Sequence, residues 1–240
     1  MKIKITDYKL TYPSDKKLVF AVAADMHNRQ YGEVMTQLVR LHPDFIAIPG
    51  DLMDVPEEAQ TAVSFLREAV SVAPVFYSVG NHERISDTGR KLITDTGCVL
   101  LDDSYVSFEG ITIGGLTSGF RTVRVNNLEK TPPPDLEWLN TFASLPGFKL
   151  LLCHHPEYYP DYIRPLAIDL TLSGHAHGGQ WRLFGRGLFA PGQGILPKYT
   201  SGIHENRFII SRGLANNAFI PRIFNTPELL SVTLLPKEKQ

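Results

Sequence analysis

The amino-acid sequence predicts an α/β fold in which parallel strands end at one shared rim. Apolar runs typical of buried strands alternate with segments of helical periodicity. Five of these runs end directly in acidic, amide or imidazole side chains. Because ligands of open α/β sheets bind beyond the carboxyl ends of the strands, we expect a chemical site at this rim. The runs are residues 18–24 before Asp25 and His27, 45–48 before Asp51, 75–79 before Asn81 and His82, 150–153 before His154, and 170–173 before His175 and His177.

The first half of the chain is predicted to alternate strands with helices. Residues 1–7 alternate charged and apolar positions, which indicates an edge strand. Apolar positions recur at helical spacing over residues 31–41, and again over 56–70 after a proline and two glutamates that suit a helix start. A shorter helix is expected over residues 86–96. Together with the apolar runs, these segments predict two successive βαβ units.

The second half is predicted to begin with hairpins. The short runs at residues 98–101, 105–108 and 111–115 are separated by turn residues, which favours an antiparallel meander. A proline-rich loop follows, and the helix after it opens with acidic residues, as the first turn of a helix prefers. The remaining elements expected are the loop at 131–134, the helix over 135–144 and strands over 208–211 and 229–234.

Composition narrows the class of protein. A length of 240 residues with 43% hydrophobic content fits a single domain over residues 1–240. The net charge of −1 leaves no broad basic field, so we expect no nucleic-acid partner. Two cysteines are too few for a disulfide framework, which favours a reducing compartment. Without a long apolar run, we expect a cytoplasmic protein, with peripheral contact at the inner face of the membrane as an alternative. No obligate protein partner is evident.

The side chains at the rim have the composition of a metal site. Mixed oxygen and nitrogen donors suit manganese, iron, zinc or nickel better than calcium. Seven ligands are too many for one tetrahedral ion, but they fit two divalent ions about 3.5 to 4 Å apart that share a carboxylate. Asp51 is central in the set and is the expected bridge. The seven expected ligands are Asp25, His27, Asp51, Asn81, His154, His175 and His177.

The charge of such a centre points to a class of substrate. Two divalent ions are offset by two aspartates and one bridging hydroxide, so the centre keeps a charge of about +1. A positive, water-activating site matches an anionic electrophile, which favours a phosphoester over a peptide bond. We therefore expect hydrolysis by direct attack of the bridging hydroxide.

The ordered motifs resemble those of the calcineurin-like metallophosphoesterases. The resemblance covers residues 25–177, and further motifs toward the C-terminus resemble the small bacterial YkuE/YaeI-type branch, some members of which cleave UDP-diacylglucosamine. The superfamily motifs are Asp25-x-His27, Gly50-Asp51-x-x-Asp54, Gly80-Asn81-His82-Glu83, His154 and Gly174-His175-x-His177. The branch motifs are residues 175–180, Ser211-Arg212-Gly213-Leu214 and Asn225-x-Pro227-Glu228.

This resemblance implies a four-layer αββα sandwich with two divalent metal ions, manganese first, with zinc, iron, nickel or magnesium as alternatives. It also implies that His82 faces the leaving-group oxygen as a donor and that Asp54 holds the other nitrogen of its ring. The implied substrate is a phosphodiester or pyrophosphate, such as a nucleotide-lipid; a phosphomonoesterase or nucleotidase, or a nuclease, is the alternative. The implied ligands are Asp25, His27, Asp51 and His177 for one ion and Asp51, Asn81, His154 and His175 for the other.

Four assignments have alternative interpretations. Asp54 also suits the cap of the helix that starts near residue 56. Arg212 could bind a phosphate or be the structural partner of a carboxylate or carbonyl. Glu83 could support the site or start a helix, in either case without a direct role. The pattern of the family selects His154 rather than His155 as the ligand.

Residues 180–202 combine large apolar side chains with glycines and three basic residues and have no clear period. Two interpretations stay open for this segment. It is a loop packed on its own side chains, or it is a surface that receives a lipid or nucleoside group or rests on a membrane.

Overall fold

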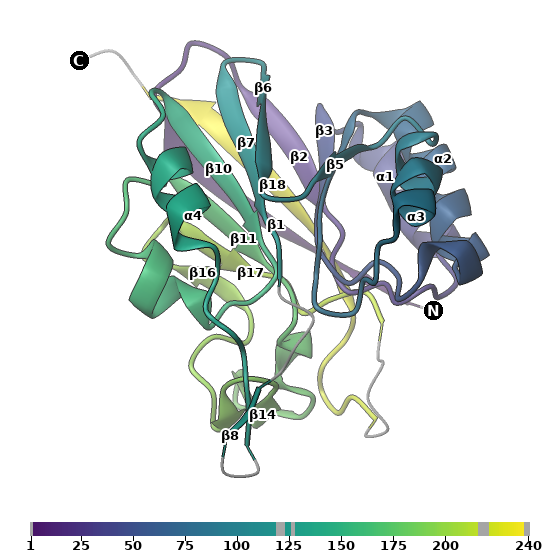
Figure 1. The fold of residues 1–240 in the computed structure, drawn as a ribbon, viewed down its shortest axis with the longest axis vertical. Helices are drawn as coiled ribbons and strands as arrows, with labels where there is room; N and C mark the ends of the chain where they lie inside the picture. The colour runs from purple at the N-terminus through teal and green to yellow at the C-terminus, as the bar shows by residue number, and fades with distance from the viewer. Residues whose placement is uncertain (1, 119–122, 126–127, 216–220, 238–240) are drawn as a thin grey trace.

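Two six-stranded sheets lie face to face at the centre of the fold (Figure 1). The computed structural model describes residues 2–118, 123–125, 128–215 and 221–237. The first sheet has the order β1-β18-β2-β3-β4-β5 and the second β16-β17-β11-β10-β7-β6. The first sheet comprises β1 (Lys4–Tyr12), β2 (Leu18–Val22), β3 (Phe45–Pro49), β4 (Val75–Ser78), β5 (Val99–Leu101) and β18 (Glu228–Pro236). The second comprises β6 (Ser104–Phe108), β7 (Ile111–Leu116), β10 (Phe148–Cys153), β11 (Leu170–Ser173), β16 (Gly202–His204) and β17 (Phe208–Ile210).

Helices cover the outer face of each sheet. Helices α1, α2 and α3 lie on the first sheet, and α4 lies on the second (Figure 1). The predicted four-layer αββα sandwich is confirmed. The helices are α1 (Gly32–Leu41), α2 (Gln60–Val72), α3 (Asp87–Thr94) and α4 (Leu136–Ala143); shorter turns occupy Pro56–Glu58, Tyr159–Ile163 and His177–Gly179. Small hairpins are formed by β8 (Val123–Val125) with β9 (Leu128–Lys130), β12 (Arg182–Leu183) with β13 (Arg186–Gly187), and β14 (Phe189–Ala190) with β15 (Gly194–Ile195).

Three apolar cores lie between the four layers. In β3, Phe45 and Ala47 face the core between the sheets, whereas Ile46 and Ile48 face the helices. Strands buried on both faces are apolar at every position, because successive side chains alternate between two cores. This explains why the strands that carry the site read as continuous apolar runs.

The strands next to the site are parallel and therefore end at the same edge. Strands β2, β3, β4 and β5 pair in parallel, as do β7, β10, β11 and β17. Strand β1 pairs with β18 at the edge of the first sheet, which confirms the predicted edge strand. The predicted helices are present, although α2 begins at Gln60 after a short 3₁₀ turn over Pro56–Glu58.

The predicted antiparallel meander over residues 98–115 is wrong in its first strand. Strand β5 pairs in parallel with β4 in the first sheet, and only β6 and β7 form an antiparallel hairpin, in the second. The turn at Asp102 and Asp103 carries the chain from one sheet to the other, with Asp103 at a φ of 42°. A turn between two hairpin strands and a turn between two sheets use the same residue types, so local sequence does not separate them.

Within the described residues, no helix is both long and apolar enough to cross a bilayer.

Candidate metal centre

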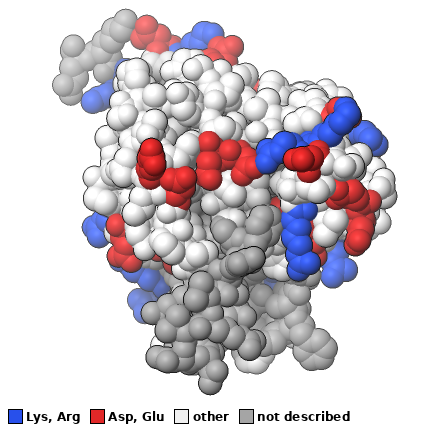
Figure 2. Space-filling model, viewed as in Figure 1, with Lys and Arg blue, Asp and Glu red and all other residues white. Residues whose placement is uncertain are grey.

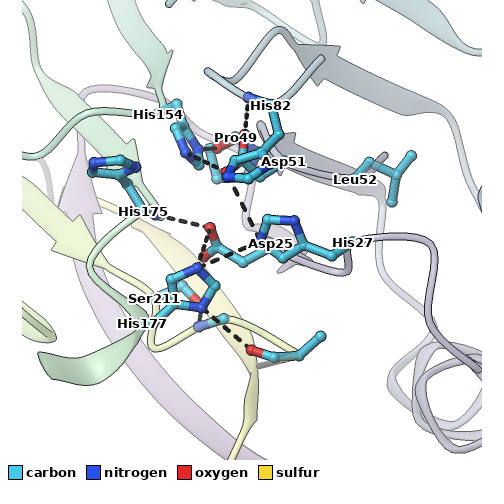
Figure 3. Close-up of polar contacts among 12 residues, drawn as sticks. Asp25, His27, Pro49, Asp51, Leu52, His82, His154, His175, His177 and Ser211 are labelled. Atoms are coloured by element: carbon cyan, nitrogen blue, oxygen red, sulfur yellow. Dashed lines mark hydrogen bonds and ion pairs between the residues drawn. The ribbon is translucent and has the colours of Figure 1, made fainter. Parts of the chain in front are cut away.

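The carboxyl ends of five strands meet where the two sheets face each other. Strands β2, β3 and β4 of the first sheet and β10 and β11 of the second lead into this region. A cavity of about 200 Å³ opens there, and Figure 3 shows imidazole and carboxylate side chains turned toward one another. The expected residues that line it are Asp51, Asn81, His82, His175 and His177, and Asp25, His27 and His154 are buried beside them.

An uncommon backbone conformation recurs at these strand ends. Five of the seven expected ligands have a positive φ, in the left-handed region that side chains other than glycine rarely adopt. Each such residue is less stable by on the order of 1 kcal/mol than in the right-handed region, so the surrounding fold must impose it. The angles are 54° at Asp25, 49° at His27, 54° at Asp51, 65° at His175 and 45° at His177.

Asp25, His27 and His177 form one group of donor atoms. The Nε2 atoms of His27 and His177 lie 3.4 Å apart, and Nε2 of His177 lies 3.9 Å from Oδ1 of Asp25. The Nδ1 atom of His177 is 3.3 Å from the carbonyl oxygen of Ala215 and 3.1 Å from Nη2 of Arg222, so Nε2 is the ring nitrogen that faces His27. The group can therefore hold a divalent cation.

Asp51, His154 and His175 form a second group, and Asp51 lies between the two. Its Oδ2 atom is 3.0 Å from Nε2 of His154 and 3.8 Å from Nε2 of His27. The Nδ1 atom of His154 lies 2.9 Å from the carbonyl oxygen of Pro49, which again directs Nε2 inward. Asp51 is thus placed to contribute to both groups.

Two oxygen atoms of the expected ligands are buried without a hydrogen-bond partner among the described residues. They are Oδ2 of Asp25 and Oδ1 of Asn81. Buried polar oxygens nearly always have partners in proteins, so an unpaired carboxylate and an unpaired amide oxygen beside free imidazole nitrogens fit a bound cation.

Three imidazoles of the two groups are held neutral. Burial lowers the pKa of His27 to about 4 and lowers the pKa values of His175 and His177. His154 differs: burial lowers its pKa, but the carboxylate of Asp51 outweighs this and raises it to about 10. A cation bound by His154 and Asp51 would therefore compete with a proton on His154.

Glu83 joins the two turns that follow β3 and β4. Its buried carboxylate accepts hydrogen bonds from the backbone N–H of Leu52 at 2.6 Å, of Gly80 at 2.6 Å and of Asp51 at 3.1 Å. The hydroxyl of Tyr77 donates a further bond at 2.6 Å. Burial, with the charge of Asp51, raises the pKa of Glu83 to about 8. Glu83 therefore holds the turns at Asp51 and Gly80 together, as expected of a residue that supports the site.

His82 and Asp54 contact each other at the wall of the cavity. The Nδ1 atom of His82 lies 3.0 Å from Oδ1 of Asp54, and the backbone N–H of His82 donates to Asp51 at 3.0 Å. Asp54 makes no capping bond, because the following 3₁₀ turn begins after Val55. The interpretation of Asp54 as a helix cap is therefore wrong.

Two further residues near the cavity were not assigned from the sequence. Glu157 lies in the turn after β10, with Oε1 3.2 Å from Nδ1 of His155 and 3.7 Å from Nε2 of His175. His155 itself lines the cavity, although the sequence set it aside as a ligand. The sequence signal that could have identified Glu157 is its position, three residues after the expected ligand His154. Glu157 is thus the acidic side chain that faces the ring of His175.

Glycines allow the two sheets to approach around Asp25. A Cβ atom at Gly174 would lie 2.7 Å from Oδ2 of Asp25, and one at Gly213 would lie 2.6 Å from it.

Arg212 plays a structural part, as one of its two interpretations predicts. Its Nη2 atom lies 2.6 Å from Oε2 of Glu228.

Comparison with known proteins identifies the protein family of this chain. The family model described as calcineurin-like phosphoesterase matches residues 18–179, a span that contains all the expected ligands. The chain belongs to the calcineurin-like phosphoesterase family and is a metal-dependent phosphoric ester hydrolase.

Comparison with individual relatives indicates the branch of the family to which the chain is similar. It is 27% identical to the uncharacterized metallophosphoesterase YkoQ of Bacillus subtilis, over 93% of this chain and 86% of that protein. It is 27% identical to the phosphodiesterase YaeI of Escherichia coli, over 87% and 80%. It is 26% identical to the uncharacterized metallophosphoesterase YkuE of Bacillus subtilis, over 80% and 68%. The resemblance to the YkuE/YaeI-type branch is confirmed.

Proposed function

We propose that the chain hydrolyses phosphodiester or pyrophosphate bonds with two divalent metal ions. The observation that supports this best is the position of Asp51, whose Oδ2 atom lies between the Nε2 atoms of His154 and His27. Two divalent ions, when bound, supply an activated water at neutral pH and bind phosphoryl oxygens. Manganese is the ion we propose first, with zinc, iron, nickel and magnesium as alternatives.

The proposed ligand sets are those that the family resemblance implies. Asp25, His27 and His177 join Asp51 at one ion, and Asn81, His154 and His175 join it at the other. The donor atoms are mixed nitrogen and oxygen, as first-row transition metals prefer.

The protein side chains then position the substrate and move one proton. His82 lines the cavity and donates from its ring to the oxygen that leaves phosphorus. Asp54 accepts from Nδ1 and so leaves Nε2 for the substrate. Glu83 keeps the turns of Asp51 and Asn81 at a fixed separation, which keeps the reacting groups aligned.

We further propose that the substrate carries a lipid or nucleoside group next to its phosphate, as in UDP-diacylglucosamine. A small cavity of about 180 Å³ lies beside the turn His177–Gly179 and is lined by Gly179, Gln180, Trp181, Leu188 and Phe189. Its walls suit an apolar or aromatic group. The relative YaeI of Escherichia coli is a phosphodiesterase, which favours a diester.

The overall charge does not favour the nuclease alternative, because the chain has a net charge of −1. Binding of a nucleic-acid backbone needs a basic track. On the face shown in Figure 2, the described lysines and arginines are interspersed with aspartates and glutamates.

A substrate panel tests the reaction class. Bis-p-nitrophenyl phosphate, p-nitrophenyl phosphate and a UDP-sugar derivative are each assayed with manganese, zinc and magnesium. We expect the diester or pyrophosphate to have the higher kcat/KM. A higher kcat/KM for the monoester would instead establish a phosphomonoesterase.

A second assay tests the substrate group. Phe189→Ser should raise KM for a short-chain acylated substrate kept below its micelle concentration, while sparing bis-p-nitrophenyl phosphate. Phe184→Ser is the matched control, because Phe184 is a neighbouring exposed phenylalanine outside that cavity. Equal effects of Phe189→Ser on both substrates would contradict the lipid or nucleoside group.

A further inference from the structure

Exposed apolar side chains are concentrated on one part of the molecule. Among the described residues, twelve large hydrophobic side chains are exposed, and eight of them belong to residues 181–198 and 221–224. We call these two segments the docking face. Its exposed apolar residues are Trp181, Leu183, Phe184, Phe189, Ile195, Leu196, Ile223 and Phe224.

Backbone hydrogen bonds join the docking face into one unit. The N–H of Leu196 donates to Leu188 at 2.9 Å, and the N–H of Leu188 donates to Trp181 at 2.9 Å. The N–H of Arg182 donates to the carbonyl of Ile223 at 3.0 Å, which connects the two segments. Figure 1 shows β14, which belongs to this face, at the lower end of the molecule, below both sheets.

Three of the four most exposed of these side chains stand on strained backbone. Phe184, Leu196 and Phe224 have φ angles of 48°, 52° and 52°, and their side chains are 105%, 70% and 81% exposed. Phe184 and Gly185 form the two-residue turn between β12 and β13, where asparagine or glycine is preferred. A large apolar residue in the left-handed region, with its side chain in water, stabilises nothing within the chain. Its apolar group is therefore available to something outside the chain.

The charge of the docking face has one sign. Its charged residues are Arg182, Arg186, Lys198 and Arg222, and the sequence has no aspartate or glutamate over residues 170–204 or 206–227. A partner must therefore be both apolar and anionic. A second copy of this face would bring eight positive charges together, which opposes self-association.

We propose that the docking face binds the surface of a lipid bilayer that contains anionic headgroups. Phe184, Leu196 and Phe224 enter the interface, and the exposed side chains of Arg186 and Lys198 contact the headgroups. Arg182 and Arg222 instead donate to the backbone carbonyls of Gly178 and Ala215. A fluid interface accepts projecting tips without a matching groove, whereas a protein partner needs a complementary surface of about 800 Å².

Docking would place the metal cavity at the membrane surface. Pro191 and Gly192 of the docking face also line that cavity, and Asn225, next to Phe224, donates to the carbonyl of His177 at 2.7 Å. Membrane binding goes beyond the proposed hydrolysis and does not depend on it, so the two fail separately.

Vesicle co-sedimentation of the metal-loaded and the metal-free chain tests the proposal. The probes are vesicles of phosphatidylcholine alone and of equal parts phosphatidylcholine and phosphatidylglycerol. We expect binding to the anionic vesicles, weaker binding to the neutral ones, and loss of the difference at high salt. The double variant Phe184→Ser with Phe224→Ser should lower the partition coefficient by roughly 100-fold, because each ring loses its apolar burial.

The control variant is Val39→Ser with Leu136→Ser, which changes two exposed apolar residues on α1 and α4. It should bind like the parent chain. The proposal is overturned if the anionic vesicles do not bind the parent, or if both double variants bind equally. The parent chain could also self-associate in a concentration-dependent way without lipid. If the Phe184→Ser, Phe224→Ser variant abolished that association, the proposal would be overturned, and the docking face would bind a second copy of the chain. Binding to an acidic protein in place of the vesicles would favour a protein partner.

Discussion

The Nδ1 atom of His82 lies 3.0 Å from the Oδ1 atom of Asp54, a contact between the turns that follow β4 and β3. We expect His82→Ala to lower kcat by roughly 10²–10⁴ while metal content stays intact, because His82 donates to the leaving group. The loss should be larger for an alkyl than for a p-nitrophenyl ester, since a poor leaving group needs the proton more. Loss of metal in this variant would make His82 a ligand.

Asp54→Asn should produce a smaller loss than His82→Ala in the same assay. The amide keeps the shape of the side chain but presents a weaker acceptor to Nδ1, so the ring is less firmly oriented. We expect a decrease in kcat of roughly 10-fold to 100-fold and no additional loss when it is combined with His82→Ala. Additive losses would show that Asp54 acts independently of His82.

Asp51→Ala should remove both metal ions or nearly so. The change takes one ligand from each proposed ion and the shared anion that lowers their repulsion. Elemental analysis after dialysis measures the metal content per chain. A variant that retained two ions would disprove the bridging role.

Gly50→Ala should disrupt the centre through a steric clash. A Cβ atom there would lie 2.6 Å from Nδ1 of His154 and 2.7 Å from the Cα atom of Gly80. Gly110→Ala is the matched control, because Gly110 has a φ of 84° against 85° at Gly50 but nothing within 4 Å of its added Cβ. We expect similar backbone strain in both variants, with loss of metal binding only in Gly50→Ala. Equal metal affinity in the two would mean that the close approach is unimportant.

Glu157→Gln should weaken one of the two proposed metal sites by roughly 10-fold to 100-fold, as the loss of a carboxylate behind a metal-bound histidine usually does. The carboxylate faces Nε2 of His175 at 3.7 Å, so its loss affects the ion held by that ring. Calorimetric titration of the metal-free chain separates the two binding steps. Glu205→Gln, at an exposed ion pair with Arg164, is the control and should leave both steps unchanged.

Cys98 and Cys153 should resist thiol reagents in the native protein. Both are free and buried, and burial raises the pKa of each thiol. A higher thiol pKa lowers the thiolate fraction at pH 8, and the thiolate is the reactive form. We expect no labelling by iodoacetamide in buffer and two labelled thiols in urea. Rapid native labelling of either residue would show that its core opens.

The sequence by itself determined the strands, the helices and the residues that follow five strands. Asp25, Asp51 and His154 were placed at strand ends because a buried parallel strand has a continuous apolar run with an abrupt polar end. That signal is local: it depends on the period of neighbouring residues. The same local reasoning assigned the run at 98–101 to the wrong sheet.

Only the tertiary structure decided which distant residues meet. Glu83 accepts a hydrogen bond from the backbone N–H of Asp51, 32 positions away. Glu157, in the turn after β10, faces the ring of His175, in the turn after β11. Neither pairing has a periodic signature, because each depends on which strands are neighbours in a sheet, β3 and β4 for the first and β10 and β11 for the second. The docking face has the same origin, since the bond between Arg182 and Ile223 joins segments that are far apart in the sequence. The sequence specified the groups of the centre, and the packing of the two sheets set their separations.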